Sequence, residues 1–308
     1  MNRSLIDRLK RCECCPRKCR VNRLGGELGF CKVSARTQIA HAGLHLGEEP
    51  PISGTRGSGT IFFPGCNLRC VFCQNYQISQ EWQQGHTRTL TTGELASEML
   101  RLQNAGAHNI NFVSPSHMVF QMAEAIEVAK GEGLAVPVVY NSNGYDSVET
   151  LRQIRGLVDI YLPDIKYMDN GSGKHFSAVS DYADNVPGAL REMLDQVGHL
   201  TMNGEGIALR GLLVRHLVLP GHLANSRRCL DLLADLSLGT CLSLMSQYSP
   251  QHRACEYPGI NRNLTQEEYD QVMDYALQLG LENVYIQELE SQEHCLPDFA
   301  LESPFKFA

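Results

Sequence analysis

From residue 60 onward, short runs of β-branched and aromatic residues alternate with longer amphipathic stretches, and this alternation constrains the fold most. The short runs predict strands at residues 60–63, 110–113, 136–140, 158–162, 213–219, 241–246 and 284–287. The pattern at residues 284–287 is weaker than the others. The longer stretches have helical periodicity, for example at residues 92–103 with Thr92 as N-cap, at 118–130 and at 265–279. Alternating strands and helices form a parallel sheet with both faces covered. The sequence therefore predicts an α/β fold whose sheet is closed or partly closed into a barrel.

Each of the first six expected strands ends in a loop that is polar or contains glycine or proline. These loops lie at residues 65–67, 114–117, 141–144, 164–166, 220–222 and 247–250. In barrels of parallel strands the active site lies at the carboxyl ends of the strands. We therefore expect these loops to converge on one mouth.

Three cysteines follow the first expected strand directly. Cys66, Cys70 and Cys73 form a C-x3-C-x2-C motif. Three thiolates in so short a loop cannot complete a tetrahedral zinc site alone, but they can hold three irons of a cubane cluster and leave the fourth iron open. The alternatives are a zinc loop that borrows a distant fourth ligand, or unliganded thiols. The spacing and the position after a strand favour the cluster.

This motif, with Phe72 before its third cysteine, resembles the signature of the radical S-adenosylmethionine superfamily. The chain looks most similar to the pyruvate formate-lyase activating enzymes, in particular to their PflX-like branch. Five segments carry that similarity in the same order, at residues 54–60, 73–76, 141–144, 164–168 and 217–221. The resemblance implies a partial (β/α)6-type parallel barrel over residues 54–308, preceded by a small Cys-rich metal-binding extension over residues 1–53.

The same resemblance implies cofactors and a reaction. Cys66, Cys70 and Cys73 would hold a catalytic [4Fe-4S] cluster, whose open iron chelates S-adenosylmethionine. The reduced cluster passes one electron to the sulfonium and releases methionine and a 5′-deoxyadenosyl radical, and a flavodoxin or ferredoxin is the implied reductant. Phe72 would lie near the adenine, and Lys166 would neutralise the methionyl carboxylate.

Other cofactor contacts follow less directly from the resemblance. Asn141 and Asn143 lie in the segment that contacts the ribose, where an amide can still bind a hydroxyl. The Gly-Gly-Glu that normally receives the methionyl amino group is replaced by the sequence Ser114-Pro115-Ser116-His117. Backbone carbonyls there, from Ser114 onward, can accept from the ammonium. His117 is a candidate substrate or cofactor contact, with a hydrogen-bonded loop histidine as the equal alternative.

A second cysteine cluster lies near the N-terminus. Cys12, Cys15, Cys19 and Cys31 form C-x2-C-x3-C-x11-C, with Cys14 as a spare. The segment is too short and polar to fold on its own, so we expect a metal to hold it. Two paired C-x2-C motifs would suggest zinc, whereas three close cysteine ligands and one distant one suggest an iron–sulfur cluster. The nearby basic residues would offset cluster charge, dock an acidic partner or simply be solvated: Arg17, Lys18, Arg20 and Arg23.

Composition excludes several other classes. The chain has 308 residues and a net charge of −7, which argues against nucleic acid as the main partner. Residues 1–36 nevertheless hold ten Lys and Arg against three Asp and Glu, so the N-terminal segment is basic and the rest of the chain is acidic. The sequence shows no stretch of the roughly 20 apolar residues that a spanning helix needs and no secretory signal, so we expect a cytoplasmic protein without a membrane partner. In that compartment clustered cysteines are metal ligands or catalytic thiols.

The remaining cysteines and two glutamates near the C-terminus give weaker indications of function. Cys229, Cys241, Cys255 and Cys295 have no ligand spacing. We expect Cys241 to be a small core residue, and Cys255 to be either a surface thiol or a hydrogen-atom donor facing the pocket. Glu288 and Glu290 follow the last expected strand. We expect them to be either surface residues or substrate contacts.

The sequence is compatible with three functions. The first is hydrogen abstraction from a protein backbone, as in an activase of a glycyl-radical enzyme. The second is the same radical chemistry on a small molecule or peptide. The third is an iron–sulfur electron-transfer or assembly protein without a radical, which the ordered cofactor-contact segments disfavour.

Overall fold

A mostly parallel sheet forms the centre of the computed structural model, which describes residues 4–289, 296–301 and 303–305. Within these residues the main sheet has the order β11–β10–β9–β7–β6–β5–β3–β2, with β8 paired to β9. All pairs from β3 to β11 along this order are parallel. Their bounds are β3 Ser58–Phe62, β5 Ile110–Val113, β6 Val138–Ser142, β7 Ile160–Pro163, β9 Ala208–Leu217, β10 Cys241–Met245 and β11 Val284–Ile286.

All seven expected strands are present, so the partial parallel barrel is confirmed. Four short strands were not expected: β1 Thr37–Ile39, β2 His41–His45, β4 Arg88–Leu90 and β8 Thr201–Met202. β2 lies within the expected N-terminal extension but pairs antiparallel with β3 at the edge of the main sheet. The division of the chain after residue 53 stays a prediction.

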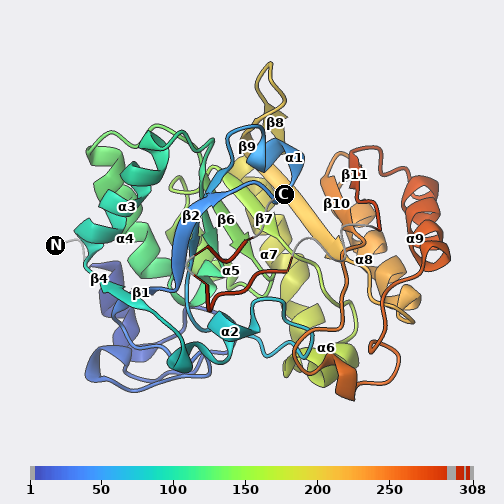
Figure 1. Cartoon of the computed structure of the whole chain (residues 1–308), viewed down its shortest axis with the longest axis horizontal. Helices are drawn as coiled ribbons and strands as arrows, with labels where there is room; N and C mark the ends of the chain where they lie inside the picture. Colours follow the sequence, from blue (N-terminus) through green and yellow to red (C-terminus); the bar gives the residue numbers. More distant parts are fainter. Residues whose placement is uncertain (1–3, 290–295, 302, 306–308) are drawn as a thin grey trace.

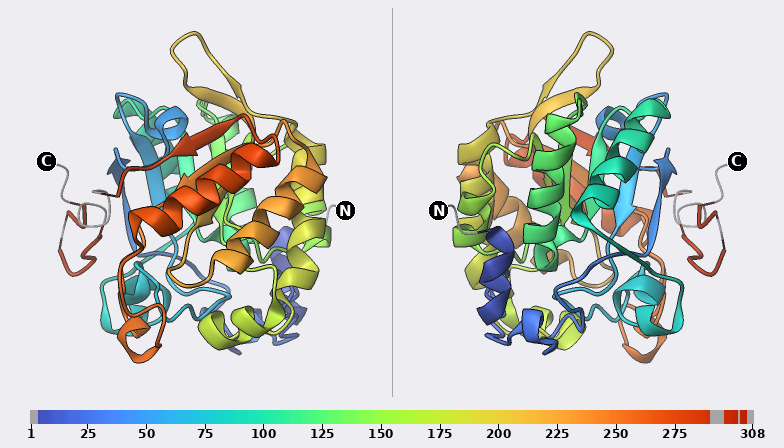
Figure 2. Two further views of the ribbon diagram at one scale, coloured as in Figure 1. Left: turned by 90° about the vertical axis from the view of Figure 1, so that its right-hand side faces the viewer. Right: turned by 90° about the vertical axis from the view of Figure 1, so that its left-hand side faces the viewer.

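Helices cover the outside of the sheet (Figure 1). They are α1 Pro50–Ser53, α2 Tyr76–Ser79, α3 Thr92–Asn104, α4 Val119–Gly131, α5 Val148–Gln153, α6 Asn170–Ser177, α7 Tyr182–Val197, α8 Leu223–Leu236 and α9 Gln266–Gln278. Figure 2 shows α8 and α9 packed side by side, and the N-terminal 3-10 helix Leu5–Arg11 against α4. None of the helices in the described ranges is long and apolar enough to cross a bilayer.

The start of α3 corrects one expectation. Thr91, not Thr92, is the N-cap, because its hydroxyl accepts from the Glu94 amide while the Glu94 carboxylate accepts from the Thr91 amide. This reciprocal pair is a capping box, and Thr92 becomes the first helical residue. α9 begins with the same device, in which Thr265 and Glu268 take these roles.

On β6, β7 and β9 the inner face of the barrel changes from apolar to polar along the strand. Alternate residues point to opposite faces of a sheet. One set packs against the helices, and the other begins with an apolar cluster that Ile52 of α1 closes: Val139, Ile160, Leu162, Leu213 and Cys241. Two residues further along the same face of β6, β7 and β9 stand Asn141, Asp164 and Arg215. Apolar side chains thus close the amino end of the barrel, and these three polar residues lie toward its carboxyl end.

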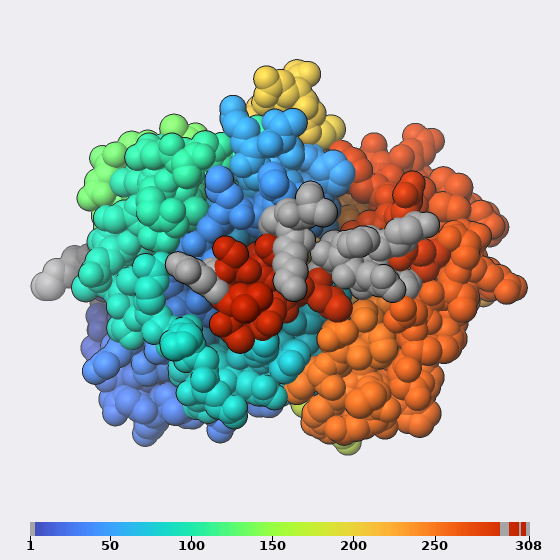
Figure 3. All heavy atoms as spheres, viewed as in Figure 1, coloured from blue at the N-terminus to red at the C-terminus, as the bar shows by residue number. Residues whose placement is uncertain are grey.

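The C-terminal segment, residues 296–301 and 303–305, covers one side of the sheet. The Phe299 ring lies 5.3 Å from that of Phe62 on β3, and the Phe305 ring 4.1 Å from that of His45 on β2. Gln77 of α2 also donates to the Asp298 carboxylate and accepts from the Phe299 amide. Figure 3 shows this segment in red across the face of the molecule.

Candidate active site

A cavity of about 220 Å³ opens at the carboxyl ends of the parallel strands. The loops after β3, β5, β6, β7 and β10 all contribute to it, so their expected convergence is confirmed: Cys66, Cys70, Cys73, Ser114, Asn143, Lys166 and Gln247 are among the lining residues. The loop at residues 220–222 does not line it. His222 packs instead against the ring of Phe176 on α6, at 5.0 Å.

The loop that carries the three cysteines is fixed by its neighbours. Gly65 has a φ of +79°, and a Cβ atom there would lie 2.6 Å from the backbone oxygen of Cys31. Only glycine fits this conformation and this approach. Further along, the Arg69 amide donates to the Ser177 carbonyl at 3.0 Å, which ties the loop to the end of α6.

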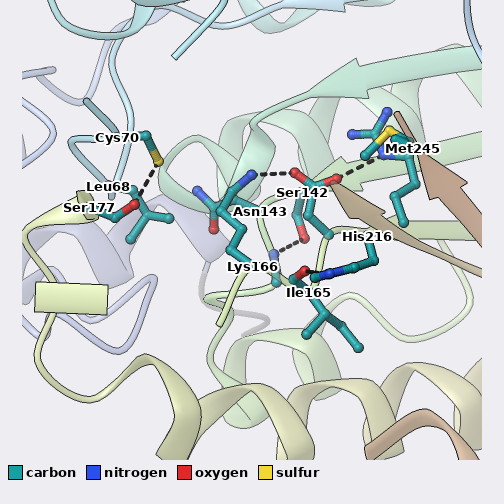
Figure 4. Close-up of polar contacts among 12 residues, drawn as sticks. Leu68, Cys70, Ser142, Asn143, Ile165, Lys166, Ser177, His216 and Met245 are labelled. Atoms are coloured by element: carbon teal, nitrogen blue, oxygen red, sulfur yellow. Dashed lines mark hydrogen bonds and ion pairs between the residues drawn. The ribbon is translucent and has the colours of Figure 1, made fainter. Parts of the chain in front are cut away.

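Hydrogen-bond donors point at the sulfurs of this loop. The Ser177 hydroxyl donates to Cys70 Sγ at 2.9 Å (Figure 4). Asn143 Nδ2 donates to Cys66 Sγ at 3.4 Å, and Cys73 Sγ lies 3.2 Å from the Ser79 hydroxyl. Hydrogen bonds to the sulfur are the contacts that stabilise metal-bound thiolates.

The donor set fits an iron–sulfur cluster better than one zinc ion. Burial raises the pKa values of Cys66 and Cys70, and that of Cys73 to about 12, so a metal is needed to hold all three as thiolates. Within the described part of the chain, no three Cys, His, Asp or Glu side chains converge on a single-ion site. Three cysteines would leave a tetrahedral zinc one protein ligand short, whereas a cubane cluster can take three cysteines and keep its fourth iron open.

Lys166 faces the same cavity in a buried ion pair. Its Nζ lies 2.7 Å from Asp164 Oδ2, and the two side chains are 16% and 14% exposed (Figure 4). Burial alone would lower the pKa of Lys166, but the Asp164 carboxylate and the nearby Cys70 outweigh it and raise that pKa. The lysine therefore carries a positive charge beside the cysteine loop.

Two charged residues that line the cavity were not predicted from the sequence. Arg215 of β9 donates to Asp164 Oδ1 at 2.8 Å and to Asn141 Oδ1 at 2.7 Å. Its Nη1 also lies 3.4 Å from Glu48 Oε2. Burial raises the pKa of Glu48, while Arg215 opposes the shift. A charged residue inside an otherwise apolar strand run was the available signal for Arg215. Glu48, in a turn-prone segment, gave none.

The other predicted cofactor contacts divide between two places. Phe72, Ser114, Asn141 and Asn143 line the cavity, with the Phe72 ring 5.9 Å from that of Tyr248. His117 does not line it. Its Nε2 lies 2.8 Å from the Pro64 carbonyl oxygen, and burial lowers its pKa to about 3. It borders a second, smaller cavity instead.

That second cavity brings the N-terminal cysteines together. Cys12, Cys15, Cys19 and Cys31 line it with the spare Cys14, and the guanidinium of buried Arg23 reaches it. Lys18 and Arg20 are exposed and Arg17 is half-buried, so of the four basic residues only Arg23 is enclosed with the sulfurs.

The weaker predictions have mixed outcomes. Cys241 is a buried core residue, as expected. Cys229 is also buried, whereas Cys255 is exposed and is not among the residues that line the cavity. Glu288 is exposed. Glu290 and Cys295 lie outside the described residues.

Comparisons with known proteins agree with this geometry. The model of the radical SAM superfamily matches residues 60–200. An uncharacterized protein of Methanocaldococcus jannaschii is 33% identical over 283 residues, which cover 90% of this chain and 77% of that protein. The pyruvate formate-lyase-activating enzyme of Clostridium pasteurianum is 27% identical over 120 residues, 37% of this chain and 48% of that enzyme.

A solved structure shares the fold. SuiB of Streptococcus suis superimposes with a TM-score of 0.51 and 12% identity, both bound to its precursor peptide SuiA and bound to S-adenosylmethionine. The matches cover 74% and 77% of this chain but only 48% and 53% of SuiB, so the chain spans about half the length of that protein. The chain belongs to the radical SAM superfamily, whose members bind S-adenosylmethionine and an iron–sulfur cluster. Within it, the chain is similar to pyruvate formate-lyase-activating enzymes.

Proposed function

We propose that this chain cleaves S-adenosylmethionine reductively and uses the resulting radical to abstract hydrogen from a protein segment. One observation carries the proposal: the three cysteines of one loop share a 220 Å³ cavity with a buried charged lysine and with Asn141 and Asn143. An electron carrier needs thiolates but has no use for this lysine and these amides beside them.

The cysteine loop would hold the [4Fe-4S] cluster. When bound, the cluster supplies one electron to the sulfonium of S-adenosylmethionine, which leaves methionine and a 5′-deoxyadenosyl radical. Ser177 and Asn143 donate hydrogen bonds to Cys70 and Cys66, and these bonds favour the extra negative charge of the reduced cluster. A flavodoxin or ferredoxin is the proposed reductant.

The remaining residues of the cavity would orient the cofactor. Lys166 offers an ammonium to the methionyl carboxylate, and Asp164 holds that ammonium in place. Phe72 offers an aromatic face to the adenine. The Asn141 oxygen accepts from Arg215 and its amide nitrogen donates to Glu48 Oε2 at 3.4 Å, so one lone pair and one amide hydrogen of Asn141 remain for a ribose hydroxyl.

Access to the cavity favours a protein or peptide substrate over a small molecule. β2 and β11 are the two ends of the strand order, so the barrel is open on one side. Ligand pockets commonly measure about 300–1,000 Å³, so a 220 Å³ cavity that receives S-adenosylmethionine leaves little room for a second small molecule. A substrate would therefore enter by the open side, where an extended segment fits. SuiB, which has the same fold, is known in complex with a precursor peptide.

The test is product analysis after anaerobic reconstitution and reduction. We expect methionine and 5′-deoxyadenosine in equal amounts, and neither product from the Cys66→Ala, Cys70→Ala, Cys73→Ala triple variant. Cys229→Ala, which removes a buried cysteine of α8 outside both cysteine sets, should keep full activity. Undiminished cleavage by the triple variant would refute the proposal.

A further inference from the structure

Five cysteines from residues 12–31 surround a cavity that the proposed reaction does not use. Cys12, Cys14, Cys15 and Cys31 are buried and Cys19 is half-buried, and none of the five forms a disulfide. Cys15 lies within charge–charge range of Cys12, Cys19 and Cys31, and Cys31 lies within that range of Cys12 and Cys19. These four cysteines therefore line one common cavity.

The fifth thiol, Cys14, lines the same cavity beside Cys12. Cys14 Sγ lies 3.7 Å from Cys12 Sγ, and both sulfurs are reached by Arg23 Nη1, at 3.9 and 3.8 Å. The same guanidinium donates to the carbonyl of His117 at 2.6 Å. A buried cation directed at sulfur is typical of the surroundings of thiolates rather than of neutral thiols.

Two further polar atoms lie at the cavity. The Phe30 amide donates to Cys19 Sγ at 3.4 Å. His117 is 2% exposed, and within the described residues its Nδ1 has no hydrogen-bond partner. Because His117 Nε2 lies 2.8 Å from the Pro64 carbonyl oxygen, Nε2 carries the ring proton and Nδ1 keeps a free lone pair. The amide donor and the unpaired ring nitrogen make the surroundings of the five sulfurs polar.

The chain around the cysteines lacks what would otherwise hold it. Residues 12–22 contain no regular helix or strand. Lys18, Arg20 and Lys32 have φ values of 42°, 58° and 63°, a conformation that costs non-glycine residues on the order of 1–3 kcal/mol each. Ligation can supply the free energy that fixes such a segment.

We propose that Cys12, Cys15, Cys19 and Cys31 bind a second metal centre through four thiolates, separate from the centre at Cys66, Cys70 and Cys73. In this assignment Cys14 is a spare thiol beside Cys12, and the Cys14→Ser variant below tests that role. The free space between the sulfurs is about 10 Å³, roughly that of one water molecule. Zinc would draw the four sulfurs together, and an iron–sulfur cluster would spread them. Both zinc and an iron–sulfur cluster bind through thiolates, and metal analysis distinguishes the two.

This second centre would brace the catalytic loop. The Cys31 carbonyl packs against Gly65, the residue before Cys66. Asn67 borders the second cavity and accepts from Asn143 Nδ2 at 2.7 Å, while the same Asn143 amide donates to Cys66 Sγ. Asn67 therefore lies between the two cysteine sets.

The experiment measures iron, zinc and acid-labile sulfide per chain in the Cys66→Ala, Cys70→Ala, Cys73→Ala background, so that any bound metal belongs to the second site. We expect about four irons with sulfide for a cubane cluster, or one zinc. Cys19→Ser should remove this metal, whereas Cys14→Ser and Cys229→Ser should retain it. Less than a tenth of these amounts after reconstitution with iron and sulfide, and with zinc, would overturn the proposal. Retention in Cys19→Ser, or loss in Cys14→Ser, would overturn the ligand assignment.

A second measurement avoids variants that fail to fold. In the metal-loaded wild-type chain, the exposed Cys255 should be alkylated at once, while the four ligands should react only after a chelator is added. Mass spectrometry of the digested protein reports each site separately. Alkylation of the four residues at the same rate with and without the chelator would contradict a metal centre.

Discussion

Lys166 is the residue at which the proposed cofactor contact can be separated from a purely structural role. Its partner Asp164 is also held by Arg215, so loss of the lysine leaves that carboxylate paired. Lys166→Ala should remove a charge-assisted hydrogen bond of about 1.5–3 kcal/mol, so S-adenosylmethionine should bind roughly ten to over a hundred times more weakly. Titration of the reduced protein, followed by the spectrum of the cluster, measures the change.

The matched control for this change is Lys174→Ala, which removes an exposed lysine of α6. Its cofactor affinity should equal that of the wild type. If Lys166→Ala also binds the cofactor as tightly as the wild type, the lysine is structural and the similarity to the activating enzymes does not extend to this position.

Ser177 tests the hydrogen bonds to the cysteine loop. Its hydroxyl donates to Cys70 Sγ at 2.9 Å. Ser177→Ala should lower the reduction potential of the cluster, because the lost bond stabilises the more negative, reduced form. A potentiometric titration followed by EPR gives the value, with Ser97→Ala on the exposed face of α3 as the control. Equal potentials in the serine variant and the wild type would exclude this role.

Residue-level prediction was best where chemistry depends on local spacing. The cysteine motif, Asn143 and Lys166 all reach the cavity because loops at the carboxyl ends of parallel strands converge there. Arg215 and Glu48 were missed because their pairing joins positions 167 residues apart, which no local pattern reveals. His117 reached a different cavity from the one expected, because its ring turns toward the Pro64 carbonyl.

At the scale of elements, His216 links β9 to the loop that carries Lys166 and to α8. Its Nδ1 lies 2.7 Å from the Ile165 carbonyl oxygen (Figure 4). Its Nε2 lies 2.9 Å from the Ser226 hydroxyl. Burial lowers its pKa to about 4. The neutral ring therefore stabilises the fold above pH 6.5, and this contribution, about 3 kcal/mol in full, is lost as the pH falls from 6.5 through 4.

An NMR titration of the imidazole checks this prediction. His216 should stay neutral down to about pH 4. A midpoint for His216 near 6.5 would show that the ring is accessible and that the link between these elements is loose.

The C-terminal segment borders the cavity. Leu296, Pro297 and Phe305 line it, and Phe299 packs on Phe62. We expect the segment to shield the cavity from solvent. The double variant Phe299→Asp, Phe305→Asp should detach it, because a carboxylate packed against the rings of Phe62 and His45 is costly. The cluster should then be bleached faster by a water-soluble oxidant, which a stopped-flow absorbance trace records.

The control for this variant is Leu301→Asp, at a position in the same segment that is 46% exposed. It should bleach at the wild-type rate. Equal bleaching rates in the double variant and the wild type would mean that the segment does not shield the cavity.

Strand prediction succeeded where burial on both faces gives a continuous apolar run, as in β5 and β6. It failed for β1, β2 and β4, which are short or partly exposed and are defined by their partners. β2 carries two histidines and a glycine, and pairing with β3 rather than its own pattern makes it a strand.

At the scale of the whole molecule, two cysteine sets from distant parts of the chain are placed on either side of Asn67. The basic N-terminal segment thereby packs against the loop that we propose holds the catalytic cluster. The sequence predicted both sets from spacing alone. Their contact through Gly65 and Cys31 depends on the tertiary fold and appears only in the structure.

We propose that S-adenosylmethionine binds at the open iron of a cluster held by Cys66, Cys70 and Cys73. The EPR spectrum of the reduced holoenzyme, recorded before and after addition of S-adenosylmethionine, tests this binding. We expect the cofactor to shift the signal of the reduced cluster in the wild type, and we expect the responding signal to be absent from the Cys66→Ala, Cys70→Ala, Cys73→Ala variant. A wild-type spectrum that is unchanged at saturating S-adenosylmethionine would show that the cofactor does not bind at this cluster.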